Sequence, residues 1–180
     1  MEEYQKNLEQ FRDDLSKLSN QTIIDLKGIL LNKIVTYEFN RNESGVVAYL
    51  FEYDFELLGL TFYGLDKYLS QYTEHIALPT KFPDDNWKNI TQESIYHFES
   101  KKTMKRYDED CNKQEIKLFD EYFVKKYNIF KNWFFICWKK ATKGIELKKG
   151  AYFSMHDTNY LTELKTMKEI EYDEVKEKHK

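Results

Sequence analysis

Three side chains of this sequence have the types that a thiol-dependent enzyme uses, namely Cys137, His156 and Asp157. In such a site the sulfur attacks, the imidazole takes its proton and the carboxylate orients the imidazole. A reactive thiol needs a partly exposed, electropositive setting, whereas Cys137 lies in NWFFICWKKA, between tryptophans and phenylalanines. Burial makes a thiol a small apolar group and raises its pKa. We therefore expect a core cysteine and no catalytic residue.

His156 and Asp157 follow an apolar segment and could contribute two ligands to a divalent metal ion. A metal site needs three or more ligands, and His75 and His97 lie in unrelated segments without a close His or Cys partner. The favoured interpretation is that Asp157 caps a following helix while His156 packs at the rim. We expect neither a metal nor a cofactor.

A second arrangement resembles the loose pattern of metal-dependent nucleases, in which carboxylates hold Mg²⁺ and a lysine assists the attacking water. Asp84 follows a proline, and Glu146 and Lys148 form a Glu-x-Lys triplet. Because Glu-x-Lys occurs five times in the chain, the triplet is weak evidence. A metal-dependent hydrolase or nuclease that uses Asp84, Glu146 and His156 is the alternative hypothesis.

The remaining candidates are acidic and aromatic residues at the ends of the predicted strands and in the loop at 79–87. A pair of carboxylates could serve a glycosidase, although such residues are common at strand ends. A surface that binds a basic protein is the more economical use, because Tyr and Trp anchor interfaces and opposite charge speeds encounter. The predicted partner-binding residues are Glu38, Glu52, Asp54, Glu56, Asp66, Asp84, Asp85 and Trp87.

Hydrophobic periodicity predicts the elements that carry these residues. Residues 4–18 have helical spacing that stops near 19–22, and a second short helix could follow. Three apolar, β-branched and aromatic segments at 33–39, 45–53 and 55–64 predict an antiparallel meander with a turn at 40–45. Helical spacing returns in several segments, namely 65–76, 91–126 with a break at 108–112, and 130–141.

The rest of the chain completes a prediction of one α+β domain over residues 1–180. The loop at 79–87 is expected to be ordered, and 144–157 is expected to form a hairpin that turns at 148–150. Residues 158–170 are predicted to form a helix that Thr158 or Asn159 caps, and about eight charged residues at the C-terminus are expected to fray. We expect the helices to pack on the meander.

Composition and charge limit the function classes. Aromatic residues make up 17% of the chain, which is typical of a folded domain rather than a disordered one. No apolar run approaches the roughly 20 residues of a membrane span, and the N-terminus lacks signal-peptide features, so a cytoplasmic location is expected. Residues 1–100 carry 9 Lys and Arg against 17 Asp and Glu, which favours a basic protein partner over nucleic acid or a membrane.

In general style the sequence resembles the small cytoplasmic immunity proteins of bacterial toxin systems and related α+β domains. The resemblance rests on the predicted strands at 33–64, on NWFFICWKKA and on AYFSMHDTN. It implies a non-enzymatic protein that binds a toxin domain and blocks its active site, and it transfers no individual site residue. A structural or regulatory protein that self-associates is a further alternative, and the oligomeric state is left open.

Overall fold

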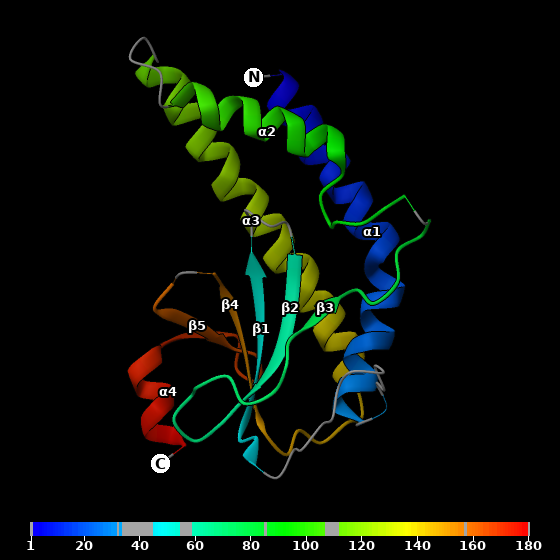
Figure 1. The fold of residues 1–180 in the computed structure, drawn as a ribbon, viewed down its shortest axis with the longest axis vertical. Coiled ribbons are helices and arrows are strands. Elements are labelled where there is room, and N and C mark those ends of the chain that lie inside the picture. Colours follow the sequence, from blue (N-terminus) through cyan, green and yellow to red (C-terminus); the bar gives the residue numbers. More distant parts are fainter. Residues whose placement is uncertain are drawn as a thin grey trace. The chain divides into compact units, whose positions relative to one another are not determined.

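The computed structural model describes residues 2–31, 33, 45–54, 59–84, 86–106, 112–156 and 158–179. Within these ranges it contains four helices and a six-stranded mixed sheet, so the α+β prediction is confirmed (Figure 1). The helices are α1 (Glu2–Leu30), α2 (Glu93–Arg106), α3 (Lys113–Thr142) and α4 (Tyr172–Lys178). The strands are β1 (Ala48–Asp54), β2 (Gly59–Leu65), β3 (Ile76–Leu78), β4 (Gly150–Met155), β5 (Tyr160–Glu163) and β6 (Lys168–Glu171).

The chain forms two compact units. The helical unit comprises residues 1–19 and 82–136, and the sheet unit comprises residues 20–81 and 137–180. Helices α1 and α3 each contribute residues to both units. The organisation of residues 1–180 as a single domain stays a prediction.

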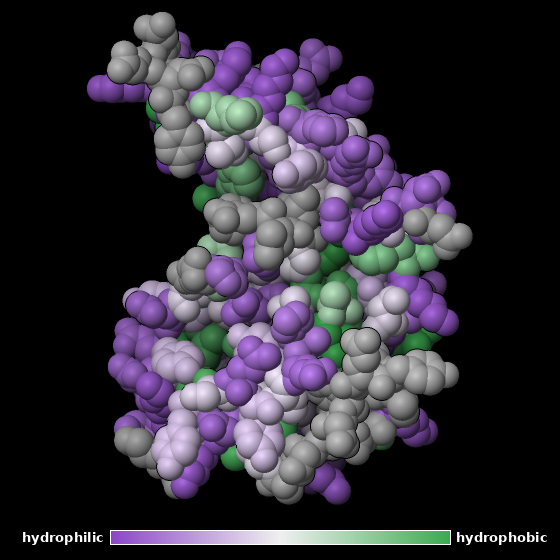
Figure 2. All heavy atoms as spheres, in the orientation of Figure 1, coloured by the Kyte–Doolittle hydropathy of each residue, from purple (hydrophilic) through white to green (hydrophobic). Residues whose placement is uncertain are grey.

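An aromatic cluster forms the core of the helical unit. Leu8 of α1 and Phe119 and Tyr122 of α3 are buried in it. Tyr4 of α1 makes an edge-on contact with Phe98 of α2, and the two ring centroids lie 5.3 Å apart. Aromatic pairs of this geometry contribute about 0.5–1.5 kcal/mol beyond their buried area. In Figure 2, the face that carries α2 shows hydrophilic side chains mixed with less polar ones, and the exposed residues of this helix include both Lys101 and Met104.

A buried ion pair fixes α2 against α3 inside this unit. Lys126 donates to both oxygens of Glu99 over 2.7 and 2.8 Å, and the Tyr122 hydroxyl donates to Oε1 of Glu99 over 2.6 Å. The Lys126 ammonium also lies 5.0 Å from the centre of the Phe11 ring. Burial lowers the pKa of Lys126, and the Glu99 carboxylate partly offsets that effect. These contacts are internal, so the group is a structural element of the helical unit.

The sheet unit has the strand order β3-β2-β1-β4-β5-β6. Strands β1 and β2 are antiparallel, as predicted, but β1 and β4 are parallel. The sheet is therefore mixed rather than a simple antiparallel meander: β1, β2 and β3 are consecutive antiparallel strands, but β4 arrives from a distant part of the chain and pairs parallel beside β1. The predicted strand at 33–39 lies outside the described residues except for Lys33.

Alternation along the strands gives the sheet two buried surfaces. Phe51 of β1 lies on one face, and Trp138 of α3 contacts it edge-on with ring centroids 5.4 Å apart. Leu50 and Tyr152 lie on the opposite face and are buried together with Val175 of α4. Full burial of such a side chain stabilises the fold by about 1.5–3 kcal/mol.

Two predicted helices are wrong because their apolar residues serve strands and turns. In the segment 65–76, Leu65 ends β2 and Ile76 begins β3, while Leu69 occupies a turn with a φ of 60°. The segment 158–170 instead contains β5 and most of β6, which pair antiparallel. Strands of four residues are too short for alternation to separate them from a helix.

The predicted hairpin at 144–157 is also wrong. Its first half forms no strand, and β4 pairs with β1 and β5 instead. The C-terminal residues expected to fray form α4, in which Val175 is buried, and fraying in solution stays a prediction. Helix α1 continues to Leu30 rather than stopping near 19–22, so the two predicted N-terminal helices are one.

Other sequence-based predictions are confirmed. Residues 131–141 are helical, and the helix ends at Thr142, before Gly144 with a φ of 77°. Cys137 is 1% exposed, as a core residue should be. Helices occupy 93–106 and 113–126 within the predicted helical region. The described residues of 79–87 form neither helix nor strand.

Candidate functional site

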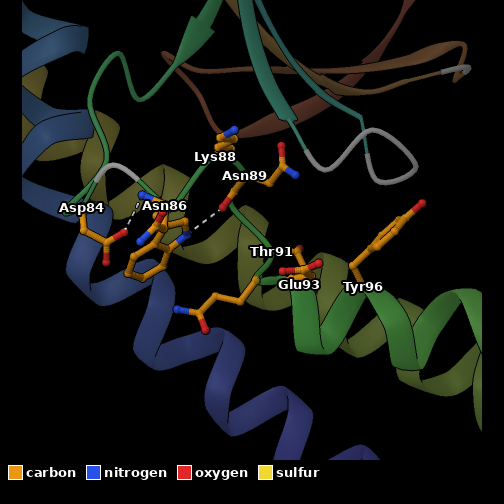
Figure 3. Close-up of a pocket in the computed structure, with 9 residues that line it drawn as sticks. Asp84, Asn86, Lys88, Asn89, Thr91, Glu93 and Tyr96 are labelled. Atoms are coloured by element: carbon orange, nitrogen blue, oxygen red, sulfur yellow. Dashed lines mark hydrogen bonds between the residues drawn. The ribbon is translucent and has the colours of Figure 1, made fainter.

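A hollow of about 740 Å³ opens in the helical unit between the loop at 84–92 and the first turn of α2 (Figure 3). Two of its lining residues, Asp84 and Trp87, belong to the partner-binding set that the sequence predicts. Glu93 and Tyr96 of α2 supply a second carboxylate and a second aromatic ring. We call this site the Trp87 hollow.

Polar groups make up the rest of the wall. Asn86, Asn89 and Gln92 contribute three carboxamides, Lys88 contributes one ammonium, and Thr91 contributes a hydroxyl. Carboxamides both donate and accept hydrogen bonds, so they suit peptide groups as well as side chains. The lining thus carries two carboxylates against one ammonium.

Local hydrogen bonds hold the loop in place. The carboxylate of Asp84 accepts from the backbone N–H of Asn86 over 3.0 Å, and the carbonyl of Asp84 accepts from the Trp87 N–H over 3.2 Å. The Trp87 indole N–H donates to the carbonyl of Asn89 over 2.7 Å. These bonds orient the indole before any ligand arrives, which lowers the ordering cost of binding.

The first turn of α2 forms the other side of the hollow. The carbonyl of Gln92 accepts from the N–H groups of Ile95 and Tyr96 over 3.1 and 3.0 Å, which starts the helix. Tyr96 projects from this turn and is 46% exposed. Thr91 is 1% exposed, and within the described ranges its Oγ1 has no hydrogen-bond partner.

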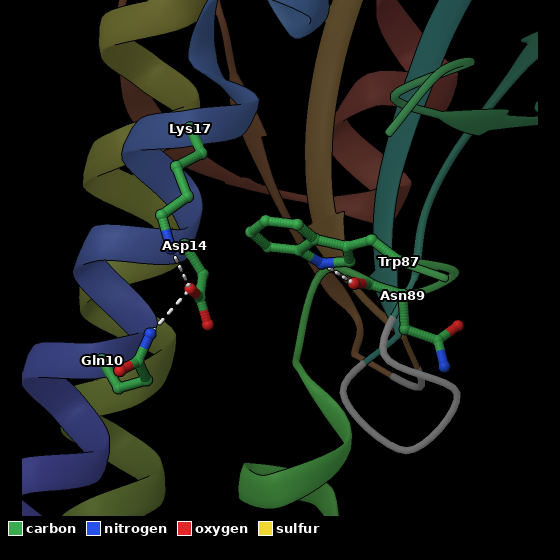
Figure 4. A network of polar contacts seen from close by, with 5 residues as sticks. All are labelled: Gln10, Asp14, Lys17, Trp87 and Asn89. Atoms are coloured by element: carbon green, nitrogen blue, oxygen red, sulfur yellow. Dashed lines mark hydrogen bonds and ion pairs between the residues drawn. The ribbon is translucent and has the colours of Figure 1, made fainter. Parts of the chain in front are cut away.

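Helix α1 contacts the loop through a network of polar and charged side chains (Figure 4). The Lys17 ammonium lies 5.3 Å from the centre of the Trp87 ring and 3.2 Å from Oδ1 of Asp14. Gln10 donates to the same oxygen over 2.9 Å. Asp14 is fully buried, and its Oδ2 has no hydrogen-bond partner among the residues the structure describes. The indole therefore already makes a cation–π contact with one cation of the chain.

The other predicted partner-binding residues do not form one surface. Glu52 and Asp54 lie toward the end of β1 that pairs with Gly59, whereas Asp66 follows β2 beside the opposite end of β1. The seven residues of β1 separate these ends by roughly 20 Å. Glu38, Glu56 and Asp85 lie outside the described residues.

Two of these carboxylates have partners within the sheet unit. Glu52 accepts from the Tyr63 hydroxyl over 3.1 Å, and its Oε1 lies 4.0 Å from Nε2 of His156. Burial, together with the charge of Glu52 and the hydrogen bond to it, raises the pKa of Tyr63. Asp66 accepts from the N–H groups of Tyr68 and Ser70 and so closes a turn. Asp84 and Trp87 are thus the predicted residues that a concave site brings together.

The alternative catalytic residues are placed differently. Glu146 precedes β4 and His156 follows it, so the six residues of that strand keep the two side chains apart. Asp84 belongs to the helical unit. In the part of the chain that the structure describes, no group of three or more His, Cys, Asp and Glu is arranged to hold a metal ion. The helix that Asp157 was expected to cap is absent from 158–170, and Asp157 itself lies outside the described residues.

Comparison with known proteins finds no matching family model, no matching curated protein and no matching solved structure. Among the described residues, no helix is both long enough and apolar enough to cross a membrane.

Sequence reasoning missed half of the hollow. The helical spacing of 91–126 places Glu93 and Tyr96 on a helix, and the predicted partner-binding set contains neither. The sequence does carry a signal, because a loop rich in polar residues runs directly into a predicted helix start. The first turn of such a helix presents its side chains beside the loop that precedes it.

Proposed function

We propose that this chain is a non-enzymatic binding protein that captures a basic segment of a protein partner in the Trp87 hollow. The observation that carries the proposal is that two carboxylates, Asp84 and Glu93, and two aromatic residues, Trp87 and Tyr96, line the same hollow, with Asp84 and Trp87 on one side of it and Glu93 and Tyr96 on the other (Figure 3). Aromatic faces attract cations, and carboxylates add charge-assisted hydrogen bonds.

Each part of the hollow has a role in this proposal. The aromatic rings provide anchor area at low conformational cost, because a tyrosine or tryptophan has few rotatable bonds. The carboxamides of Asn86, Asn89 and Gln92 are suited to pairing with the backbone of an extended segment. The acidic charge of residues 1–100 supports faster encounter with a basic partner.

The resemblance to immunity proteins suggests a biological setting for this activity. In that setting the partner is a basic toxin domain in the cytoplasm, and the chain blocks it by occupying its surface. The setting adds nothing to the geometry of the hollow. Binding of a basic segment is therefore the part of the proposal to test first.

Calorimetric titration of the full chain with lysine- and arginine-rich peptides tests the proposal. We expect binding that weakens between about 0.1 and 0.5 M salt, because screening shortens the reach of the charges. Trp87→Ala should weaken binding by about tenfold or more, as loss of an anchor residue does. Tyr160→Ala is the matched control, since Tyr160 is 55% exposed on β5 of the sheet unit.

A second pair of variants separates charge from folding. Asp84→Asn removes a charge from the lining of the hollow, and Glu146→Gln removes one from an exposed residue outside that lining. Asp84→Asn should weaken binding while Glu146→Gln should not, and both should melt near the wild-type temperature. If no basic peptide binds, or if all four variants bind equally well, the proposal is wrong.

A further inference from the structure

We infer that helix α4 is a pH-sensitive cover on one face of the sheet, docked while His179 is neutral and loosened when its imidazole takes up a proton. The helix packs on the face that carries Leu50 and Tyr152, and Val175 in its middle is 0% exposed. All of these residues belong to the sheet unit, so the device acts apart from the Trp87 hollow.

Two residues of β4 form the seat of His179. The Tyr152 hydroxyl lies 3.0 Å from Nε2 of His179, and the two rings meet edge-on with centroids 6.0 Å apart. Gly150 leaves room for the imidazole, because a Cβ at that position would lie 3.0 Å from Nε2. A neutral imidazole can accept the Tyr152 proton, whereas an imidazolium can only donate. Protonation would therefore leave the Tyr152 proton without an acceptor among the described residues.

The charges nearest to His179 disfavour its protonation as well. Burial lowers the pKa of His179, and the charge of the neighbouring Lys178 adds to that effect. The Lys178 ammonium is paired over 3.1 Å with Oε1 of Glu163 on β5. Oε2 of Glu163 accepts from the Thr166 hydroxyl over 2.7 Å. The carboxylate on this side of α4 thus already has two donors, and Lys178 balances its charge.

The other acids around α4 lie in solvent or at its far end. Asp173, Glu174 and Glu177 of α4 are exposed, and Asp66 acts on Tyr172 at the start of the helix. The remaining neighbours of this end of α4 and of Glu163 are apolar or basic, namely Ala48 and Leu50 of β1, Ile170 and Lys168 of β6, and Lys165. A proton on His179 therefore adds a cation to a partly buried and mostly basic site.

The direction of the pH effect follows from these contacts. When α4 detaches, His179 enters solvent, where its pKa is about 6.5. As the pH falls below that value, the detached form takes up a proton more readily than the docked form, so docking weakens. Tyr152 and Glu163 do not titrate in this range, because the pKa of Tyr152 is raised and that of Glu163 is lowered. His179 is thus the group of this seat that responds to mild acid.

NMR of the full chain, labelled with ¹⁵N, tests the inference between about pH 8 and 5. We expect His179 to titrate below about 6.5. The backbone amides of α4 should lose hydrogen-exchange protection as the pH falls through the same range, after correction for the intrinsic pH dependence of exchange. Unchanged protection of α4 over this range, or a His179 pKa at or above about 6.5, would overturn the inference.

Three variants separate the imidazole from other effects of acid. His179→Gln keeps a hydrogen-bond acceptor without a titratable group, so α4 should stay protected at low pH. Gly150→Ala should displace the imidazole, bring its pKa toward the ordinary value and reduce the pH dependence. His97→Gln is the matched control, because His97 is an exposed residue of α2 and its loss should leave the wild-type response. Equal loss of protection in wild type and His179→Gln would also overturn the inference.

Discussion

Individual residues of this chain separate into those whose polar groups are used within the fold and those that line the Trp87 hollow. Asp66 closes a turn, Glu52 accepts from Tyr63, and Cys137 fills the core. Asp84 and Trp87 instead line the Trp87 hollow, and both make hydrogen bonds within their own loop. The sequence alone predicted these two residues correctly as neighbours in a loop, but it gave equal weight to carboxylates that the sheet unit uses internally.

The Tyr63–Glu52 contact predicts a specific response to alkaline pH. Burial and the Glu52 carboxylate raise the pKa of Tyr63 above its ordinary value of about 10. Just above pH 10, the hydroxyl therefore stays protonated in the folded state but ionises in the unfolded chain. This contribution to stability is present below about pH 10 and is lost as the pH rises further. In the difference between wild-type and Tyr63→Phe absorbance titrations, Tyr63 should ionise well above pH 10.

Glu52→Gln should shift that ionisation to lower pH, because it removes the second cause of the raised pKa. Burial, the largest cause, remains in this variant. An unchanged titration of Tyr63 in Glu52→Gln would show that the two side chains do not interact in solution.

Substitution of Cys137 tests the assignment of this residue to the core. Cys137→Ser introduces a hydroxyl at a position that is 1% exposed, and it should lower the free energy of unfolding by about 1–3 kcal/mol. Urea denaturation measures that change, and peptide binding by the folded fraction should be unaffected. Loss of binding at unchanged stability would mean that the thiol has a functional role.

At the scale of helices and strands, the long elements were predictable and the short ones were not. The apolar stripes of α1 and α3 repeat over several turns, so helical spacing identifies both. Strands β5 and β6 have four residues each, and β3 has three, too few for a reliable period. The parallel pairing of β1 with β4 joins segments far apart in the sequence, and no local pattern encodes it.

The contact between α2 and α3 gives a prediction at this scale. Glu99→Ala would leave Lys126 buried without its carboxylate, which should cost about 3–5 kcal/mol in the free energy of unfolding. Replacing both residues, with Glu99→Leu and Lys126→Met, should cost much less, because no buried charge remains. Urea denaturation of the single and double variants distinguishes the two cases.

The pH dependence of the single variant provides its control. Burial already lowers the pKa of Lys126, and without Glu99 nothing offsets that effect. The unfolded chain then binds a proton that the folded state releases, so the variant should regain stability as the pH rises toward about 10.4. A loss below about 1 kcal/mol in Glu99→Ala, or no recovery at high pH, would contradict a tight buried pair.

At the scale of the whole chain, composition predicted a folded protein and hydrophobic periodicity predicted an α+β fold, but neither predicted the division into a helical and a sheet unit. Charge and aromatic content predicted a surface for a basic partner, and the predicted residues belong to both units. The hollow narrows it to one segment, residues 84–96, because Glu93 and Tyr96 follow the loop directly on α2. The hollow could not be predicted from composition, because its shape depends on the path of the backbone.

The central claim is that a basic segment binds in the Trp87 hollow, and NMR shift mapping tests it most directly. The full chain, labelled with ¹⁵N, is titrated with an arginine-containing basic peptide. Shifts should concentrate in the backbone amides of residues 84–96 and in the Trp87 indole N–H, and Tyr160→Ala should leave them unchanged. Shifts concentrated at Glu52 and Asp54 instead, or no shifts at saturating peptide, would contradict the account.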